Sequence, residues 1–130
     1  MTTTPAIKIT AALGALILLV TAAFHMTGLP DVTSSVTGVE RELFREGLPG
    51  MWAMVGVHWI FMAFLAFGLS RYKSKACAAI LTAFGIWLLV DALIIFKYVG
   101  AFVAVYMIGA AGLFLLASGL MQRKFARLPD

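Results

Sequence analysis

Charged residues are scarce in this chain of 130 residues. Only 12% of the residues are Asp, Glu, Lys or Arg, whereas 62% are hydrophobic. A soluble domain needs a polar surface, and so few charges would leave almost none to face water. The composition therefore excludes an ordinary soluble domain.

Cysteine, proline and the motifs of soluble enzymes are also scarce. The single cysteine, Cys77, excludes an internal disulfide, and a reduced thiol packed as a small apolar residue is its default state. None of the four prolines falls inside the long apolar runs described below, which counts against the discontinuous helices typical of transporters. The chain has no Gly-rich phosphate loop, no nucleophile elbow and no His-x-x-x-His spacing. The sequence therefore favours a role that is not enzymatic.

Long apolar sequence is what the chain has in abundance. Four runs occupy residues 7–27, 51–69, 76–96 and 101–121. A helix needs about 20 mainly apolar residues to cross a bilayer core of about 30 Å. Because lipid offers no hydrogen bonds to backbone groups, such runs predict helices and not strands. We therefore expect an all-α fold, with residues 1–130 forming a single integral membrane domain, a four-helix bundle.

The basic residues predict how this bundle is oriented. Seven of the ten flank the runs on one side of the predicted membrane: Lys8, Arg71, Lys73, Lys75, Arg123, Lys124 and Arg127. Lys97 lies on the other side, and so do Arg41 and Arg45, which four acidic residues of the same loop outnumber. Positive charge near the ends of spans marks the cytoplasmic side. Both termini are therefore expected in the cytoplasm, most simply of a bacterial inner membrane. Because topology explains the net charge of +4, no nucleic-acid partner is expected.

Residues 28–50 form the one long connection, and they would lie on the outer side of the membrane. Thr37 and Glu40 have the spacing of a capping box, which predicts that a helix starts there. The apolar and charged residues that follow are typical of a short amphipathic helix at the membrane surface. Gly47 and the pair at 49–50 are expected to end this helix before the second run.

The few polar residues in the runs gather in the predicted outer half: His25, His58, Asp91 and Tyr106. An ionisable group inside a bilayer costs at least about 2.5 kcal/mol on insertion scales, so it normally faces the bundle and has a partner. Asp91 is therefore the strongest candidate, with His58 as its expected partner. Asp91 either fixes the helix register or acts on a ligand or proton, and both interpretations stay open. We predict that these four residues form a cofactor-binding site.

Methionines on the second run suggest a possible metal site. Met51, Met54, His58 and Met62 are spaced by three, four and four residues, so they form one stripe on a helix. Thioether and imidazole groups are ligands that suit Cu(I), although methionine at helical spacing is also an ordinary packing residue. Two histidines would also suit a haem, and a quinone would need only an apolar slot with hydrogen-bonding groups. The cofactor itself therefore stays unassigned.

The sequence favours a non-enzymatic accessory or assembly subunit of a larger membrane complex, because almost no mass lies outside the predicted spans. Its expected partners are the lipid bilayer and either other membrane subunits or a second copy, since four helices leave apolar faces exposed. One alternative is a ligand-binding or redox protein of the outer leaflet that uses His25, His58 and Asp91. Another is a small proton-coupled transporter that uses Asp91. Both alternatives place the function in the outer half.

Overall fold

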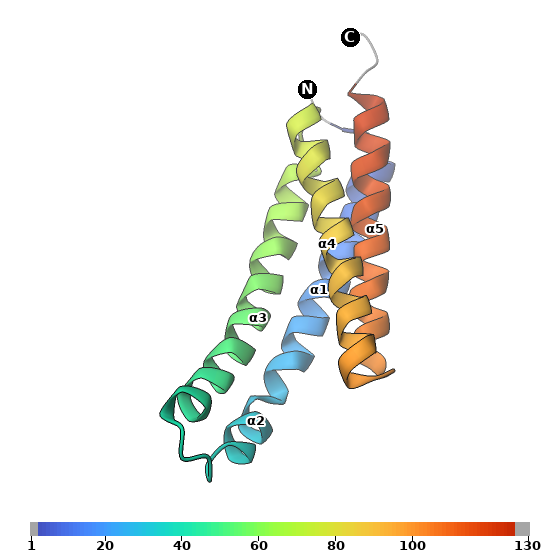
Figure 1. Cartoon of the computed structure of the whole chain (residues 1–130). Helices are drawn as coiled ribbons and strands as arrows, with labels where there is room; N and C mark the ends of the chain where they lie inside the picture. Colours follow the sequence, from blue (N-terminus) through green and yellow to red (C-terminus); the bar gives the residue numbers. More distant parts are fainter. Residues whose placement is uncertain (1–2, 127–130) are drawn as a thin grey trace.

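The computed structural model describes residues 3–126, and within them it is helical with no strand. The helices are α1 (Pro5–Thr27), α2 (Leu29–Ser35), α3 (Glu42–Leu69), α4 (Lys75–Val99) and α5 (Val103–Phe125) (Figure 1). Four helical segments are long and apolar enough to span a membrane: α1 together with α2, then α3, α4 and α5. The predicted all-α fold with four apolar spans is therefore confirmed.

The chain reverses between α4 and α5 in a short connection. Gly100 has φ +98°, in the left-handed region that favours glycine, and its N–H bonds to the carbonyl of Phe96 at 3.1 Å. At the other end of α4, the Ser74 hydroxyl caps the helix by accepting a hydrogen bond from the Ala76 N–H at 3.2 Å. These two residues define a helix that pairs with α5 as an antiparallel hairpin (Figure 1).

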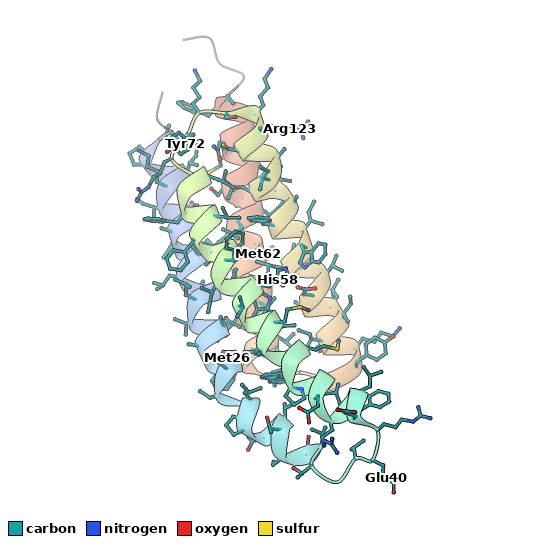
Figure 2. All side chains as sticks on the ribbon, turned by 90° about the vertical axis from the view of Figure 1, so that its left-hand side faces the viewer. Met26, Glu40, His58, Met62, Tyr72 and Arg123 are labelled. Carbon is teal, nitrogen blue, oxygen red and sulfur yellow. The ribbon has the colours of Figure 1, made fainter. Side chains whose placement is uncertain are left out.

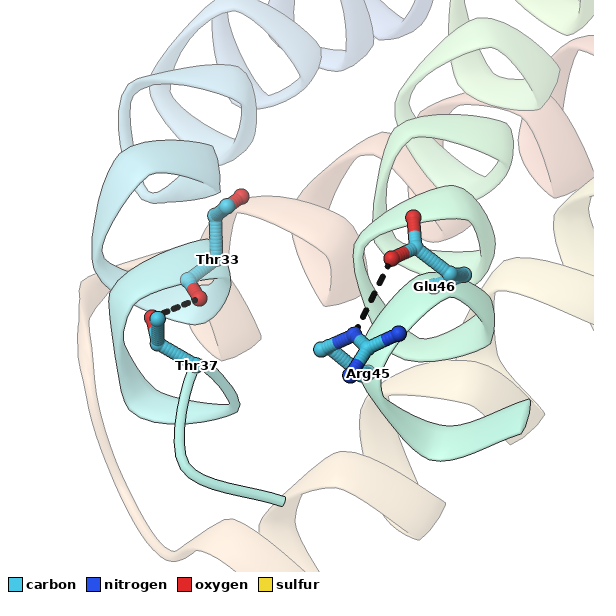
Figure 3. Close-up of polar contacts among 4 residues, drawn as sticks. All are labelled: Thr33, Thr37, Arg45 and Glu46. Carbon is cyan, nitrogen blue, oxygen red and sulfur yellow. Dashed lines mark hydrogen bonds and ion pairs between the residues drawn. The ribbon is translucent and has the colours of Figure 1, made fainter. Parts of the chain in front are cut away.

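The long connection differs from the sequence prediction. Residues 29–35 are helical, and the Thr37 hydroxyl donates back to the carbonyl of Thr33 at 3.2 Å (Figure 3). It also donates to the carbonyl of Ser34 at 2.9 Å. The predicted capping box is therefore not formed, because the hydroxyl is already used in the preceding turn. The next helix starts at Glu42.

The start of α3 also differs from the prediction, because the residues assigned to a separate surface helix are its first turns. The helix continues through Gly47 and Pro49 without a break. A proline inside a helix removes one hydrogen bond, here the bond to the Arg45 carbonyl, four residues earlier. Arg45 lies on an exposed turn, where water can replace that bond, and its side chain pairs with Glu46 at 3.2 Å (Figure 3).

Glycines bring the backbones of α4 and α5 into contact. A Cβ added at Gly85 would lie 2.4 Å from the backbone nitrogen of Leu116, and one added at Gly119 would lie 2.6 Å from that of Thr82. Only glycine permits such an approach. In a membrane, where lipid is as apolar as the helices, close backbone approach supplies the dispersion contacts that hold helices together.

The four long helices follow one another around the bundle in the order α4, α5, α1, α3. Each neighbouring pair in this order packs extensively, whereas α3 and α4 make few contacts although they are adjacent in sequence. We call the end where α1 begins and α5 ends the terminal end, and the opposite end the loop end. From their connection at the terminal end, α3 and α4 diverge toward the loop end (Figure 1).

Hydrogen bonds tie the helices together at the terminal end. The fully buried Gln122 of α5 donates through Nε2 to the carbonyls of Leu69, at 3.2 Å, and of Tyr72. Thr3 donates through its hydroxyl to the carbonyl of Ser70. The last carbonyls of a helix have no intrahelical partner, so these side chains satisfy the end of α3 and the turn after it. The terminal end of α3 is therefore fixed to α5 and to the start of the chain.

The glycine contact generates a stability prediction. Gly85→Ala should lower the free energy of unfolding by about 1–3 kcal/mol, because the added Cβ has no room against the Leu116 backbone. Gly109→Ala is the matched control, since its Cβ would meet its nearest neighbour, Ala92, at an ordinary 3.9 Å. Thermal unfolding in detergent, followed by circular dichroism, measures the stability of both variants. Equal stability of the two variants would contradict the proposed backbone contact.

Candidate functional site

A groove of about 610 Å³ lies where α3 and α4 diverge. We call it the α3–α4 groove and define it by six of its lining residues: His58, Trp59, Met62, Phe84, Trp87 and Asp91. Small-molecule sites in proteins typically measure about 300–1,000 Å³ and are mainly apolar with a few placed polar groups. The groove has a volume in this range, and its walls are mainly apolar with His58 and Asp91 as ionisable groups.

Helical spacing directs these residues into the groove. On α3, His58 and Met62 are four residues apart, and Figure 2 shows them one turn apart on the same helix. On α4, Phe84, Trp87 and Asp91 are separated by three and four residues, so they share one face. Each wall of the groove is therefore a single helical face.

Asp91 is the acidic group of the groove, and it is partly buried. Its hydrogen-bonding neighbours are the indole groups of Trp87, one turn earlier on α4, and Trp59 on α3. A carboxylate removed from water needs such donors, because desolvation without them is costly. The tryptophans thus form the polar support of Asp91 as well as the apolar walls.

His58 shares the groove with Asp91, although these two described side chains form no direct ion pair. The imidazole is exposed on the groove side of α3, and among residues 3–126 it has no hydrogen-bond partner. A neutral imidazole has one donor and one acceptor nitrogen. His58 therefore offers a bound molecule both functions.

The methionine stripe extends along α3 without converging on one point. Met54, His58 and Met62 line the α3–α4 groove, whereas Met51 lines a second cavity at the loop end. Met51 and Met62 are about 16 Å apart along the helix axis. One copper ion therefore cannot contact the whole stripe. Among residues 3–126, no three His, Cys, Asp or Glu side chains are grouped to hold a metal ion.

His25 is paired with Trp52 of α3 and lies outside the groove. Its Nε2 bonds to the Trp52 carbonyl at 2.9 Å, and the Trp52 indole N–H donates to the His25 carbonyl at 2.8 Å. Because a carbonyl only accepts, the His25 Nε2 carries the proton in this arrangement. The two rings stack with centroids 4.0 Å apart. We call this pair the His25–Trp52 clasp. It joins α1 to α3 and occupies one of the two ring nitrogens of His25.

The second cavity, of about 550 Å³, adjoins the α3–α4 groove at the loop end. The two cavities share Val55 and Trp59, and the second is also lined by His25 and Trp52. Trp59 meets the His25 ring edge-on at a centroid distance of 5.0 Å. One side chain therefore connects the clasp to the groove that holds Asp91.

The structure brings together two of the four predicted cofactor-binding residues. His58 and Asp91 line one groove, His25 lies in the adjoining cavity, and Tyr106 lines neither, with 65% of its surface exposed on α5. The sequence also offered Trp87, one turn from Asp91, as a partner of its carboxyl group, but it missed Trp59. The available signal was that an indole N–H inside an apolar span needs a polar partner.

The clasp generates a second prediction. Trp52→Phe keeps an aromatic ring but removes the N–H donor, and His25→Phe removes the reciprocal donor. Each variant should lower the free energy of unfolding by about 1 kcal/mol. Because the two residues contact each other, the double variant should lose less than the sum, with a coupling energy of about 0.5–1 kcal/mol. Strict additivity in thermal unfolding would contradict a shared interaction.

No model of a known protein family, no curated protein and no solved structure matches this chain. Its function is therefore inferred from the groove residues themselves.

Proposed function

We propose that this protein binds a lipid-soluble ligand with a hydrogen-bonding head group, of the quinone class, in the α3–α4 groove. One observation carries the proposal: His58 and Asp91, ionisable residues of two different apolar helices, line the same aromatic groove. Ionisable residues within membrane spans are costly and commonly mark functional sites.

The chemistry of the groove suits a quinone head group. The head group is a flat ring with carbonyl oxygens that accept hydrogen bonds, and its apolar tail favours the bilayer. Trp59, Trp87 and Phe84 offer aromatic surfaces for the ring. His58 can donate a hydrogen bond to one carbonyl, because its imidazole has no other hydrogen-bond partner among residues 3–126. A ligand could enter laterally between the diverging helices.

The other cofactors considered from the sequence are less well supported. A haem with two histidine ligands would need both His58 and His25, which line different cavities, and a copper ion could use only part of the methionine stripe. A carrier role for Asp91 has no discontinuous mid-span helix to support it, since α1, α4 and α5 are unbroken. A quinone needs neither a second histidine ligand, nor the whole methionine stripe, nor a broken helix.

We also propose that the protein acts as an accessory subunit of a larger membrane complex. One observation favours this role: within residues 3–126, little of the chain lies outside the four long apolar helices. The largest such segment is α2 with the loop that follows it. A subunit of this kind would hold its ligand beside a partner that carries the chemistry. Other membrane subunits or a second copy are the proposed neighbours.

The orientation and location are proposals of the same kind. Both termini are proposed to lie on the cytoplasmic side of a bacterial inner membrane, because seven of the ten basic residues belong to the segments at the terminal end. The α3–α4 groove then opens in the outer leaflet. The first turns of α3 are exposed and carry Leu43 and Phe44 among charged residues, which supports a position at the membrane surface.

Binding can be tested with a short-chain quinone added to the purified protein in detergent. Two of the three tryptophans line the groove, so the quinone should quench the intrinsic fluorescence in a saturable way. His58→Ala and Asp91→Asn should each weaken binding about tenfold, the equivalent of about 1.4 kcal/mol. Tyr106→Phe, which alters an exposed residue outside the groove, should bind like the unmodified protein.

Circular dichroism must show that each variant keeps its helical content. The proposal is wrong if folded His58→Ala and Asp91→Asn both bind as tightly as the unmodified protein. It is also wrong if the quenching never saturates, because that result describes partitioning of quinone into the detergent.

Orientation can be tested by cysteine labelling, since Cys77 is the one cysteine of the chain. In a Cys77→Ala background, Glu40→Cys introduces a thiol at the loop end and Lys124→Cys one at the terminal end. In intact bacterial cells, a membrane-impermeant maleimide should label the first variant, and the second should react only after permeabilisation. The reverse pattern would overturn the proposed orientation.

A further inference from the structure

Another cavity, of about 530 Å³, lies along α4 near the terminal end and shares only Ala83 with the α3–α4 groove. We call it the basic groove and define it by its lining residues: Lys75, Ala79, Thr82, Ala83, Ile86 and Arg123. All but Arg123 belong to α4. Its two cations and apolar floor differ from the acidic, aromatic character of the α3–α4 groove.

We propose that the basic groove binds one anionic phospholipid. The phosphate lies between Lys75 and Arg123, and one acyl chain follows the small residues of α4 toward the membrane centre. Basic pockets between membrane helices are known to take the head groups of anionic lipids. This proposal does not depend on the ligand of the α3–α4 groove.

Within residues 3–126, no acidic side chain balances the charge of the groove. Lys75 and Arg123 are exposed and form no ion pair among residues 3–126. The acidic residues in that range are the four that precede α3 or lie in its first turns, together with Asp91. Arginine presents several N–H donors in a planar fork that matches phosphate oxygens. An anion bound here would supply the missing negative charge.

The position of Lys75 strengthens this argument. It is the first residue of α4, and the first turn of this helix contains no acidic residue. The N-terminus of a helix carries a partial positive charge, so a cation there is unfavourable unless an anion is near. A phosphate beside Lys75 and Arg123 would offset both the side-chain charges and the helix dipole.

The floor of the groove has the shape of an acyl-chain track. Ala79 and Ala83 are one turn apart on the same face, and these small side chains line the cavity together with Ile86. From Lys75 to Ile86 the helix rises about 16 Å, about half of a 30 Å bilayer core. The groove therefore extends from the head-group level to the middle of the membrane, as one leaflet of lipid does.

The neighbouring cations provide a matched control. The Arg71 guanidinium lies over the Phe67 ring, 4.2 Å from its centroid, and neither Arg71 nor Lys124 lines the basic groove. Lys75→Gln with Arg123→Gln removes two charges from the groove. Arg71→Gln with Lys124→Gln removes two charges from the same end without altering the groove. The two double variants have the same net charge, so long-range attraction to an anionic bilayer changes equally in both.

The test is lipid retention measured by native mass spectrometry of the full chain, purified with phosphatidylglycerol or with phosphatidylcholine. The unmodified protein should retain one phosphatidylglycerol at least about tenfold more than phosphatidylcholine, a difference of about 1.4 kcal/mol. The Lys75/Arg123 variant should lose this preference, and the Arg71/Lys124 variant should keep it. Equal loss in both variants would overturn the proposal in favour of non-specific charge attraction.

A second arm distinguishes a lipid from free phosphate. Ala79→Leu should fill the track and reduce phosphatidylglycerol retention several-fold, whereas Ala117→Leu, at an exposed position of α5 outside the groove, should not. Millimolar inorganic phosphate should fail to displace the lipid. If inorganic phosphate displaces it completely, or if Ala79→Leu retains as much lipid as the unmodified protein, the acyl-chain track is wrong.

Discussion

Backbone contact between α4 and α5 is the constraint from which the rest of the bundle follows. Because lipid provides no hydrophobic force between helices, the pair with the closest approach holds together most firmly. The face of α4 that carries Gly85 is committed to α5, and Leu115 of α5 packs on Gly14 of α1. The remaining helix, α3, packs on α1 and meets α4 only weakly. The α3–α4 groove is thus the result of helix pairing.

The polar groups of the groove depend on the same arrangement. The clasp between His25 and Trp52 fixes the loop-end half of α3 on α1, and Trp59 meets His25 on one side and Asp91 on the other. Asp91 can therefore both hold the helices in register and act on a ligand. Two indoles that stabilise its carboxylate also form the walls against which a flat ligand would stack. A site prepared in this way needs little rearrangement on binding, which reduces the entropic cost of association.

The sequence predicted the fold class well, because length and hydropathy alone decide which segments must satisfy their backbone groups inside lipid. It also identified Asp91 and His58, because ionisable residues inside apolar runs are conspicuous. The groove itself could not be predicted, since it depends on which helices pair. The clasp joins residues 27 positions apart, and nothing in the local pattern selects Trp52 as the partner of His25. The capping box failed because a hydroxyl has several local acceptors, and Thr37 uses those behind it.

Because α3 is attached to α5 at its terminal end, a small tilt of the helix about that point moves its loop end the most. Gln122 holds the carbonyl of Leu69, so the pivot lies at the last turn of the helix. A helix of 28 residues is about 42 Å long, and a tilt of about 5° at the pivot moves its far end by about 4 Å. Since α3 and α4 share few contacts, such a tilt breaks little packing between them. The packing of α3 on α1 therefore sets the width of the groove. A substitution on α1 that weakens this packing would alter the size of ligand that fits, although no residue of α1 lines the groove.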